Sequence, residues 1–367
     1  MNRTTPPSTL DRRAFLQAVA AIGGGAFATA CAQRVPAFAG ASGALASSAS
    51  LAGLRDQIGL QLFTVRDRFP TDYAGTLQAV AKIGYKQVQP TMSYGGKSPA
   101  EVKAILDQNG LTAPTTHVSP AFGPDFERML DEYASMGHRY TTVRVDTEGR
   151  GGGARGERPA GAAAGATGAT PGPAASAAPA AGAAAAGAPR TPRPPAPPQT
   201  LDGVKRTANA LNEAGRITQK HGIKVIVHNH TVEFTPLADS SQRPYDVLLA
   251  ETDPSLVAME LDIGWATVAG QKALDLFKQA PGRFEVWHVK DIANLAALSG
   301  MTSQAERQRA ARIVPLGEGE IDYRPIFAQA ALAGMKHFYV EQDSAPQSGD
   351  SLAAAAASYR NLAKLLV

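Results

Sequence analysis

Histidines and carboxylates gather in four short stretches in the second half of the chain, each at the end of a run rich in Val, Ile or Leu. The stretches read HNHTVE (228–233), ELD (260–262), HVKD (288–291) and EQD (341–343). Imidazole with carboxylate is the ligand mixture of Mn²⁺, Zn²⁺, Co²⁺ or Fe²⁺, whereas Mg²⁺ prefers oxygen alone. No thiolate accompanies them, which favours an open catalytic site over a closed structural zinc site. These residues therefore predict a divalent metal ion with Glu or His beside it to move protons.

Apolar runs typical of strands alternate with amphipathic runs typical of helices along most of the chain. No G-x-G-x-x-G or G-x-x-x-x-G-K-[ST] phosphate loop follows a strand, which argues against a nucleotide-binding fold. Eight such units predict a closed (β/α)₈ TIM barrel. The strands are expected at 58–64, 85–90, 112–118, 140–146, 223–230, 257–265, 284–292 and 336–343. The helices are expected at 73–84, 98–110, 126–137, 202–222, 245–252, 273–282, 323–334 and 352–366.

The carboxyl ends of barrel strands share one face, and that face carries the active site in such folds. Every predicted strand brings a polar residue there, and several histidines and carboxylates on one mouth favour function over scaffolding. The residues at these ends are Gln61, Arg66, Gln89, His117, Arg144, His228, Asn229, His230, Glu233, Glu260, Asp262, His288, Lys290, Asp291, Glu341 and Asp343.

Seven motifs, in this order, resemble those of bacterial xylose-isomerase-like barrel proteins of the sugar phosphate isomerase/epimerase family. They are GLQLFTVRD, IGYKQVQP, VHNHTVEF, MELDIGW, WHVKD, PLGEGEIDYRPIF and YVEQD, and the resemblance covers residues 56–148 and 201–367. It implies a metal held by the residues that end strands five to eight. On this chain those are His228, Asp262, His288 and Glu341.

Three positions depart from the pattern of that family. His228 stands where many relatives have Glu, Trp265 where many have His, and Gln89 where relatives often carry Glu. Glu233 is the alternative fourth ligand, or an acid/base beside a His-ligated metal. The departures argue against assuming the usual two-glutamate proton shuttle of aldose–ketose isomerisation.

Roles follow for the other residues at the mouth. The predicted catalytic residues are Glu233, Glu341 and His230, and the predicted substrate-binding residues are Gln61, Arg66, Gln89, His117, Trp265 and Lys290. Lys290 and Arg66 suit either substrate-orienting cations or salt-bridge partners. Trp265 suits either core packing or stacking on a sugar, and Asp291 is expected to fix a neighbouring segment.

The N-terminus predicts export from the cytoplasm. Arg12-Arg13 precedes Phe15-Leu16 and a Gly/Ala-rich apolar run, which resembles a twin-arginine (Tat) signal peptide over residues 1–36. Residues 37–53 read as a flexible tether before a barrel over 54–367. Cys31, the single cysteine, lies in a degenerate lipobox, so the mature protein is either a lipidated, membrane-anchored lipoprotein or a free periplasmic protein.

A low-complexity insert interrupts the barrel at 151–200. It is almost wholly Ala, Gly and Pro, and with so few large apolar residues it is expected to be disordered. Residues 1–50 and 151–200 each hold four arginines against one acid, so the rest of the chain is slightly acidic despite the net charge of +4. Nucleic-acid binding is therefore not expected.

Three functions remain open at this point. The first is a metal-dependent isomerase or epimerase that acts on an unphosphorylated sugar, since sugar phosphates are scarce outside the cytoplasm. The second is a lyase or hydrolase of 3-keto-glycosides that uses the same metal and enediolate chemistry. The third is a non-catalytic, sugar-binding exported protein. The expected partners are a small sugar and the Tat machinery, and a homo-oligomer is compatible with the sequence.

Overall fold

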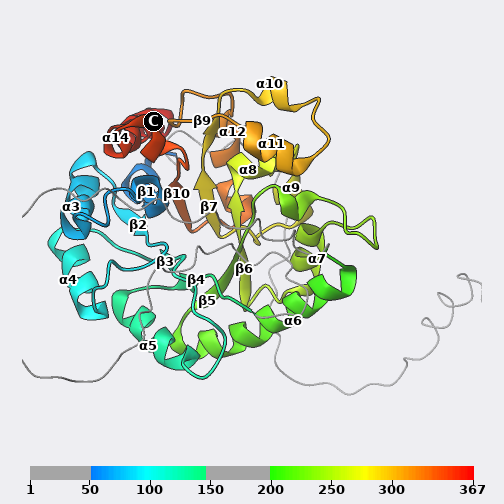
Figure 1. Ribbon diagram of the computed structural model, residues 1–367, viewed down its shortest axis with the longest axis horizontal. Helices are drawn as coiled ribbons and strands as arrows, with labels where there is room; N and C mark the ends of the chain where they lie inside the picture. The colour runs from blue at the N-terminus through cyan, green and yellow to red at the C-terminus, as the bar shows by residue number, and fades with distance from the viewer. Residues whose placement is uncertain (1–50, 146–198) are drawn as a thin grey trace, which may run out of the picture. The chain divides into compact units, whose positions relative to one another are not determined.

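A computed structural model describes residues 51–145 and 199–367 of the chain (Figure 1). The predicted signal peptide, Cys31 and nearly all of the predicted tether and insert lie outside these residues. Leu51, at the end of the predicted tether, is buried against the barrel core. Thr200, at the end of the predicted insert, caps the following helix by accepting a hydrogen bond from the Gly203 backbone N–H.

Eight parallel strands form the barrel, and this confirms the predicted fold class. The ladder runs β2-β1-β10-β7-β6-β5-β4-β3, and bridges from Gln87 to Thr112 and from Thr91 to His117 bring its two ends together. The strands are β1 (Gly59–Gln61), β2 (Gln87–Gln89), β3 (Thr115–Thr116), β4 (Tyr140–Thr141), β5 (Lys224–His228), β6 (Val257–Asp262), β7 (Val286–Val289) and β10 (His337–Val340).

Helices surround the strands as a ring in Figure 1. Local signals set their ends: Ser98 and Glu101 form a capping box at one helix start, and Gly84 follows the end of another. The α-helices of the ring are α3 (Tyr73–Ile83), α4 (Pro99–Gln108), α5 (Phe126–Met136), α6 (Leu201–Thr218), α7 (Pro244–Glu251), α9 (Ala273–Gln279), α12 (Tyr323–Phe327), α13 (Ala330–Ala333) and α14 (Ser351–Leu365). Short 3₁₀ turns are η1 (Arg55–Gln57), η2 (Leu62–Val65), η3 (Gln219–His221), η4 (Val232–Phe234) and η5 (Ala345–Ser348).

The sequence overestimated strand length at the catalytic face. The strand predicted at 257–265 ends at Asp262, because the Asp262 carboxylate caps a new helix, α8 (Ile263–Val268), by accepting from the Trp265 N–H. The first strand likewise ends at Gln61, whose side chain accepts from the Phe63 N–H and starts η2.

A segment between β7 and α12 was not anticipated as structured. It contains an antiparallel pair, β8 (Asp291–Ile292) with β9 (Ile313–Val314), and two helices, α10 (Leu295–Leu298) and α11 (Gln304–Ala310). The sequence interpretation had extended the seventh strand to Ile292. In the structure the ladder stops at Val289 and the chain turns out of the barrel.

The barrel interior is layered because alternate residues of a strand point the same way. One layer is an apolar cluster of Ile226, Ala258, Val286 and Tyr339. Two residues further along β5, β6 and β7 stand His228, Glu260 and His288, so the interior changes from apolar to polar toward the carboxyl ends of the strands. Within the two described ranges, no helix is long and apolar enough to cross a membrane.

Candidate metal and proton-transfer site at the barrel mouth

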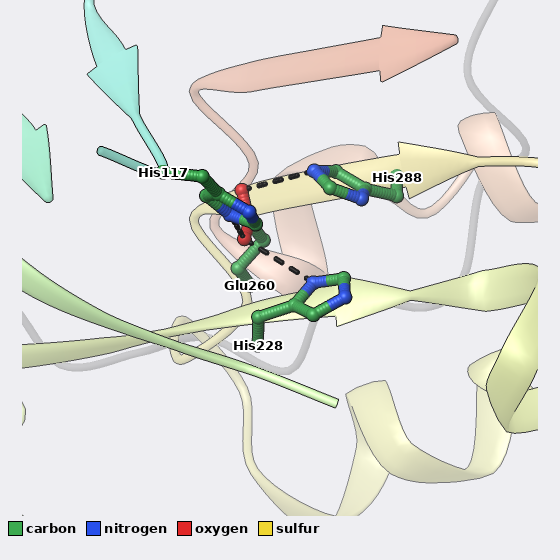
Figure 2. A group of neighbouring side chains, drawn as sticks. All are labelled: His117, His228, Glu260 and His288. Atoms are coloured by element: carbon green, nitrogen blue, oxygen red, sulfur yellow. Dashed lines mark hydrogen bonds and ion pairs between the residues drawn. The ribbon is translucent and has the colours of Figure 1, made fainter. Parts of the chain in front are cut away.

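A buried carboxylate, Glu260 on β6, lies at the centre of the polar layer (Figure 2). The Nε2 atom of His117 is hydrogen-bonded to its Oε2. His228 Nδ1 lies 3.3 Å from the same oxygen, and His288 Nε2 lies 3.3 Å from Oε1. Gln89 bridges two of these residues: its Nε2 donates to Glu260 Oε1 at 2.6 Å, and its Oε1 lies 2.6 Å from His288 Nε2. We call His117, His228, Glu260 and His288 the Glu260 group.

A second group shares His288 and lies on the other side of its ring. Nδ1 of His288 is 2.8 Å from Glu341 Oε2 and 3.8 Å from Asp262 Oδ2. Asp262, His288 and Glu341 place their ligand atoms within 4.8 Å of one another, and we call them the Asp262 group. All three residues are buried.

Lys290 brings a buried ammonium to the Asp262 group. Its Nζ lies 2.9 Å from Asp262 Oδ2, 3.0 Å from Glu341 Oε2 and 2.6 Å from Asp343 Oδ2. Three carboxylates therefore meet one lysine, and negative charge remains in excess. The lysine predicted as a substrate-orienting cation is engaged by acidic side chains of the site.

Contacts with the backbone fix two residues of this side of the mouth, Asp262 and Lys290. The Asn229 side chain accepts from the Asp262 N–H at 3.0 Å and donates to the Asp262 C=O at 3.2 Å, which ties the end of β5 to the end of β6. The hydroxyl of Tyr323 accepts from the Lys290 N–H and donates to the Lys290 C=O. Asp262 Oδ1 is used as the cap of α8, so Oδ2 is the oxygen that faces the group.

Electrostatics divide the ionisable groups into charged and neutral ones. Burial lowers the pKa of His288, but Glu260 and Glu341 outweigh it and raise the value to about 10. Burial would raise the pKa of Glu260, yet His117 and His288 hold it well below its usual range. Both interactions stabilise an imidazolium–carboxylate pair when no metal is bound.

The two histidines that flank Asn229 are held neutral. Burial lowers the pKa of His228 well below its usual value, and burial together with the Lys290 ammonium lowers the pKa of His230 to about 4. Burial also raises the pKa of Asp262 to about 6, against the effect of Lys290. A neutral imidazole is the form that accepts a proton or binds a metal.

The side chains present fit a divalent ion. Asp262 Oδ2 is buried 2.9 Å from the Lys290 ammonium, and the carboxylates of Asp262, Glu341 and Asp343 together exceed the single positive charge of that ammonium. Buried negative charge in excess of its counter-charge favours a bound cation. The four predicted ligands are brought to one mouth, but they do not form one set: His228 belongs to the Glu260 group, across His288 from Asp262 and Glu341.

The remaining predicted site residues lie outside the Glu260 and Asp262 groups. The Glu233 carboxylate accepts from the His230 N–H at 2.8 Å, and Glu233 is in neither group. The guanidinium of Arg66 donates to the backbone carbonyls of Phe63 and Asp343. Gln61 contacts His117 through its amide nitrogen at 3.4 Å. Trp265 is buried, with its ring 4.8 Å from Lys290 Nζ.

Two residues at the centre of the site were seen at strand ends in the sequence but given no role. They are Glu260 and Asp343. Alternation along the predicted strands could have found them, because residues two apart point to the same side of a strand. Glu260 lies two residues before Asp262, and Asp343 lies two residues after Glu341. Asp291 matches its expected role, because its carboxylate accepts from the N–H groups of Gly317, Gly319 and Ile321 and fixes that turn.

Solved structures resemble this fold along most of its length. A sugar phosphate isomerase/epimerase from Parabacteroides distasonis superposes with a TM-score of 0.55 at 19% identity, covering 83% of this chain and 93% of that one. The IOLI protein with a bound zinc atom gives a TM-score of 0.55 at 13% identity, with 84% and 98% covered. At these identities the likeness concerns the fold alone.

Curated relatives match over a shorter stretch. Inosose dehydratase from Lactiplantibacillus plantarum is 26% identical over 162 residues, which are 43% of this chain and 52% of that protein. Inosose dehydratase from Geobacillus kaustophilus is 30% identical over 125 residues, 33% of this chain and 39% of that protein. The chain thus spans at most about half the length of these relatives.

The model of one family covers more than half of the chain, from residue 174 to residue 364. The architecture described above is the one that this family is named for. The chain belongs to the xylose isomerase-like TIM barrel family.

Proposed function

We propose that this protein is a metal-dependent lyase of unphosphorylated keto sugars or keto-inositols. It removes the proton beside the carbonyl and expels the oxygen substituent on the next carbon. The observation that carries the proposal is the Asp262 group, whose three ligand atoms converge in an acidic, buried mouth beside a neutral His230. The similarity to inosose dehydratases, which the name describes as removing water from a keto-inositol, supports this reaction class.

Asp262, His288 and Glu341 would hold the metal. When bound, a divalent ion there supplies Lewis acidity that polarises the substrate carbonyl and makes the adjacent C–H more acidic. His230 accepts that proton, the electron pair of the C–H bond moves toward the carbonyl, and the C–O bond on the next carbon breaks. His230 then returns the proton to the departing oxygen, so water or an alcohol leaves and the atoms balance.

Gln89 favours elimination over epimerisation. An amide neither gives nor takes a proton at neutral pH, and both polar atoms of this buried amide are engaged by Glu260 and His288. Epimerisation returns the proton to the opposite face of the carbon, which needs a second acid/base on that face. Elimination needs only the base that returns its proton to the leaving oxygen.

An isomerase or epimerase is the second candidate. The fold is shared with a sugar phosphate isomerase/epimerase and with an L-ribulose 3-epimerase, which gives a TM-score of 0.50. The first half of that reaction is the same proton removal. The two candidates differ in the second half: elimination breaks a C–O bond and gives the proton to the departing oxygen, whereas isomerisation or epimerisation returns the proton to carbon.

We also propose that the protein acts outside the cytoplasm, because of its twin-arginine N-terminus. Export supports an unphosphorylated substrate. The engagement of Lys290 by carboxylates and of Arg66 by backbone carbonyls supports it further, since neither cation is left for a phosphate. Fractionation of cells that express the full chain, with Arg12 and Arg13 changed to Lys as control, tests the location.

Metal-loaded full-length protein, incubated with a keto-inositol and with a 3-keto-glucoside in D₂O, tests the function. We expect loss of water or alcohol, seen by NMR and by the ultraviolet absorbance of the unsaturated ketone. His230→Ala should lower the rate at least about 100-fold, the usual contribution of a general base. His221→Ala, which removes an imidazole that pairs with Asp131 outside the mouth, is the matched control and should keep the rate.

Other outcomes select the alternatives. Deuterium uptake with a rearranged sugar and no elimination would establish the isomerase or epimerase. Tight sugar binding without deuterium uptake into any substrate would contradict both enzymatic proposals and leave a binding protein.

A further inference from the structure

The hydrogen bonds around Glu260 have fixed directions that can be traced from two groups of unambiguous polarity. A backbone N–H can only donate, and an ionised carboxylate can only accept. The Phe63 N–H lies at one end of the network and the Glu260 carboxylate at its centre. These two groups determine every other direction between them.

The path to His117 starts at Phe63. The Phe63 N–H is 2.6 Å from Gln61 Oε1, so the amide nitrogen of Gln61 is the atom that faces His117 Nδ1. That nitrogen donates, and Nδ1 accepts. Nε2 of His117 therefore carries a proton, which it donates to Glu260 Oε2.

The path to His288 starts at Glu260. Because the carboxylate only accepts, the amide nitrogen of Gln89 must face it, at 2.6 Å. The amide oxygen of Gln89 then faces His288 Nε2, also at 2.6 Å, and Nε2 must carry a proton to donate to it. Nδ1, on the opposite side of the ring, faces Glu341 and Asp262.

We infer that Gln89 and Glu260 are positioning residues that hold the Nε2 proton of His288, so that Nδ1 is the ring nitrogen that gives up its proton and binds the metal. The Asp262 group then holds the cation. The Glu260 group, although it has the composition of a metal site, holds protons. The inference rests on the proposed metal at the Asp262 group and specifies how this chain's own residues prepare that site.

This network explains why a glutamine suits position 89. Two carboxylates at this distance in a buried layer would repel each other, and a carboxylate facing Glu260 could not donate to it. Outer hydrogen bonds that orient a metal-binding histidine commonly change metal affinity by about 10–100-fold when they are removed. We expect a change in metal affinity of the same size when the hydrogen bond of Gln89 to His288 is removed.

The structure offers matched controls at the opposite end of the barrel. Gln87, two residues before Gln89 on the same strand, contacts His337 Nδ1 through its Oε1 at 3.0 Å. Glu285 is an interior carboxylate that pairs with Lys224 and accepts from the Tyr140 hydroxyl. Gln89→Leu is therefore compared with Gln87→Leu, and Glu260→Gln with Glu285→Gln.

The experiment is a Co²⁺ titration of the metal-free full-length protein, read by visible absorbance. We expect one equivalent to bind, and we expect Gln89→Leu and Glu260→Gln to weaken binding about 10–100-fold while both controls stay within about threefold. Histidine ¹⁵N NMR of the Zn²⁺ form should show His288 with a proton on Nε2 and the metal on Nδ1. Urea unfolding of each variant separates a loss of affinity from a loss of fold.

Three results would overturn the inference: zinc on His288 Nε2, two bound equivalents of which His117→Ala removes one, or equal weakening by the Gln89 and Gln87 variants. If Gln89→Leu does not fold, the NMR signature of wild-type protein decides alone. A wild-type protein that binds no ion would contradict the proposed metal-dependent function as well. If the wild type binds Co²⁺ and Gln89→Leu binds it with the same affinity, this inference is contradicted and the proposed function is not.

Discussion

At the scale of single residues, Lys290 shows how the mouth is balanced without a metal. Its side chain is 1% exposed, and its ammonium contacts Asp262, Glu341 and Asp343. These contacts outweigh burial and raise the pKa of Lys290 well above its usual value. The lysine therefore stays charged and offsets the repulsion among the three carboxylates that it contacts.

Lys290→Met should destabilise the metal-free protein by about 3–5 kcal/mol, the cost of leaving buried charges unpaired. Added Zn²⁺ or Mn²⁺ should recover part of that loss, because a cation at the Asp262 group replaces the missing charge. Urea unfolding with and without metal measures both effects.

Lys103→Met is the control for this change. Lys103 pairs with Asp107 on an exposed helix face, where an ion pair contributes at most about 0.5 kcal/mol. Equal destabilisation by the two variants would mean that the carboxylates around Lys290 need no counter-charge.

At the scale of elements, one carboxylate fixes the turn at 317–321, which lies in the segment between β7 and α12. Asp291 accepts from the N–H groups of Gly317, Gly319 and Ile321. The polypeptide at Gly319 comes so close that an added Cβ would lie 2.2 Å from Asp291 Oδ1. Gly317 lies beside it with a φ of +86°, a conformation that favours glycine. This turn also lies just before α12, which carries the Tyr323 hydroxyl to Lys290.

Gly319→Ala should displace this turn and lower the free energy of unfolding by about 2–4 kcal/mol, since it breaks partly buried hydrogen bonds to Asp291 and forces a steric overlap. Gly300→Ala lies in the same segment with nothing within 4 Å of the added Cβ, and it should be nearly neutral. Thermal unfolding of both variants provides the measurement. A Gly319→Ala protein as stable as the wild type would show that the turn can move without loss.

At the scale of the whole molecule, stability depends on histidines that fold in their neutral form. His138 is fully buried, with Nδ1 bonded to the Ala113 carbonyl and Nε2 2.8 Å from the Tyr94 hydroxyl. Burial lowers its pKa to about 4, below the value of about 6.5 expected in the unfolded chain. His337, at the amino end of β10, has a pKa lowered to about 4 by burial as well.

The stability that neutral His138 contributes is complete above about pH 6.5, because neither state then binds the proton. As the pH falls from 6.5 to 4, His138 binds a proton in the unfolded state but not in the folded state, and the free energy of unfolding decreases. The shift corresponds to about 3 kcal/mol over that interval. Urea unfolding of wild type and His138→Gln at several pH values should show the difference between them shrinking by this amount toward pH 4. A constant difference would contradict a neutral, buried imidazole.

The amino-acid sequence by itself determined the eight-fold alternation of strands and helices, and with it the end of the barrel at which polar residues collect. Period-two and period-3.6 patterns are local, so they can be recognised without knowing which segments meet. The capping box at Ser98 and the strand-end residues from Gln61 to Glu341 were found in this way.

Tertiary structure alone decided which of those residues meet and through which atoms. Gln89 and His288 are 199 residues apart, and their contact depends on the stagger of strands around a closed barrel. The same geometry separates His228 from Asp262 and Glu341, and places Glu260 among three imidazoles. A sequence pattern gives the side of a strand on which a residue lies, but neither its height in the barrel relative to other strands nor the direction of a hydrogen bond. The division that we propose, into a metal-holding and a proton-holding side of the mouth, depends on those two quantities.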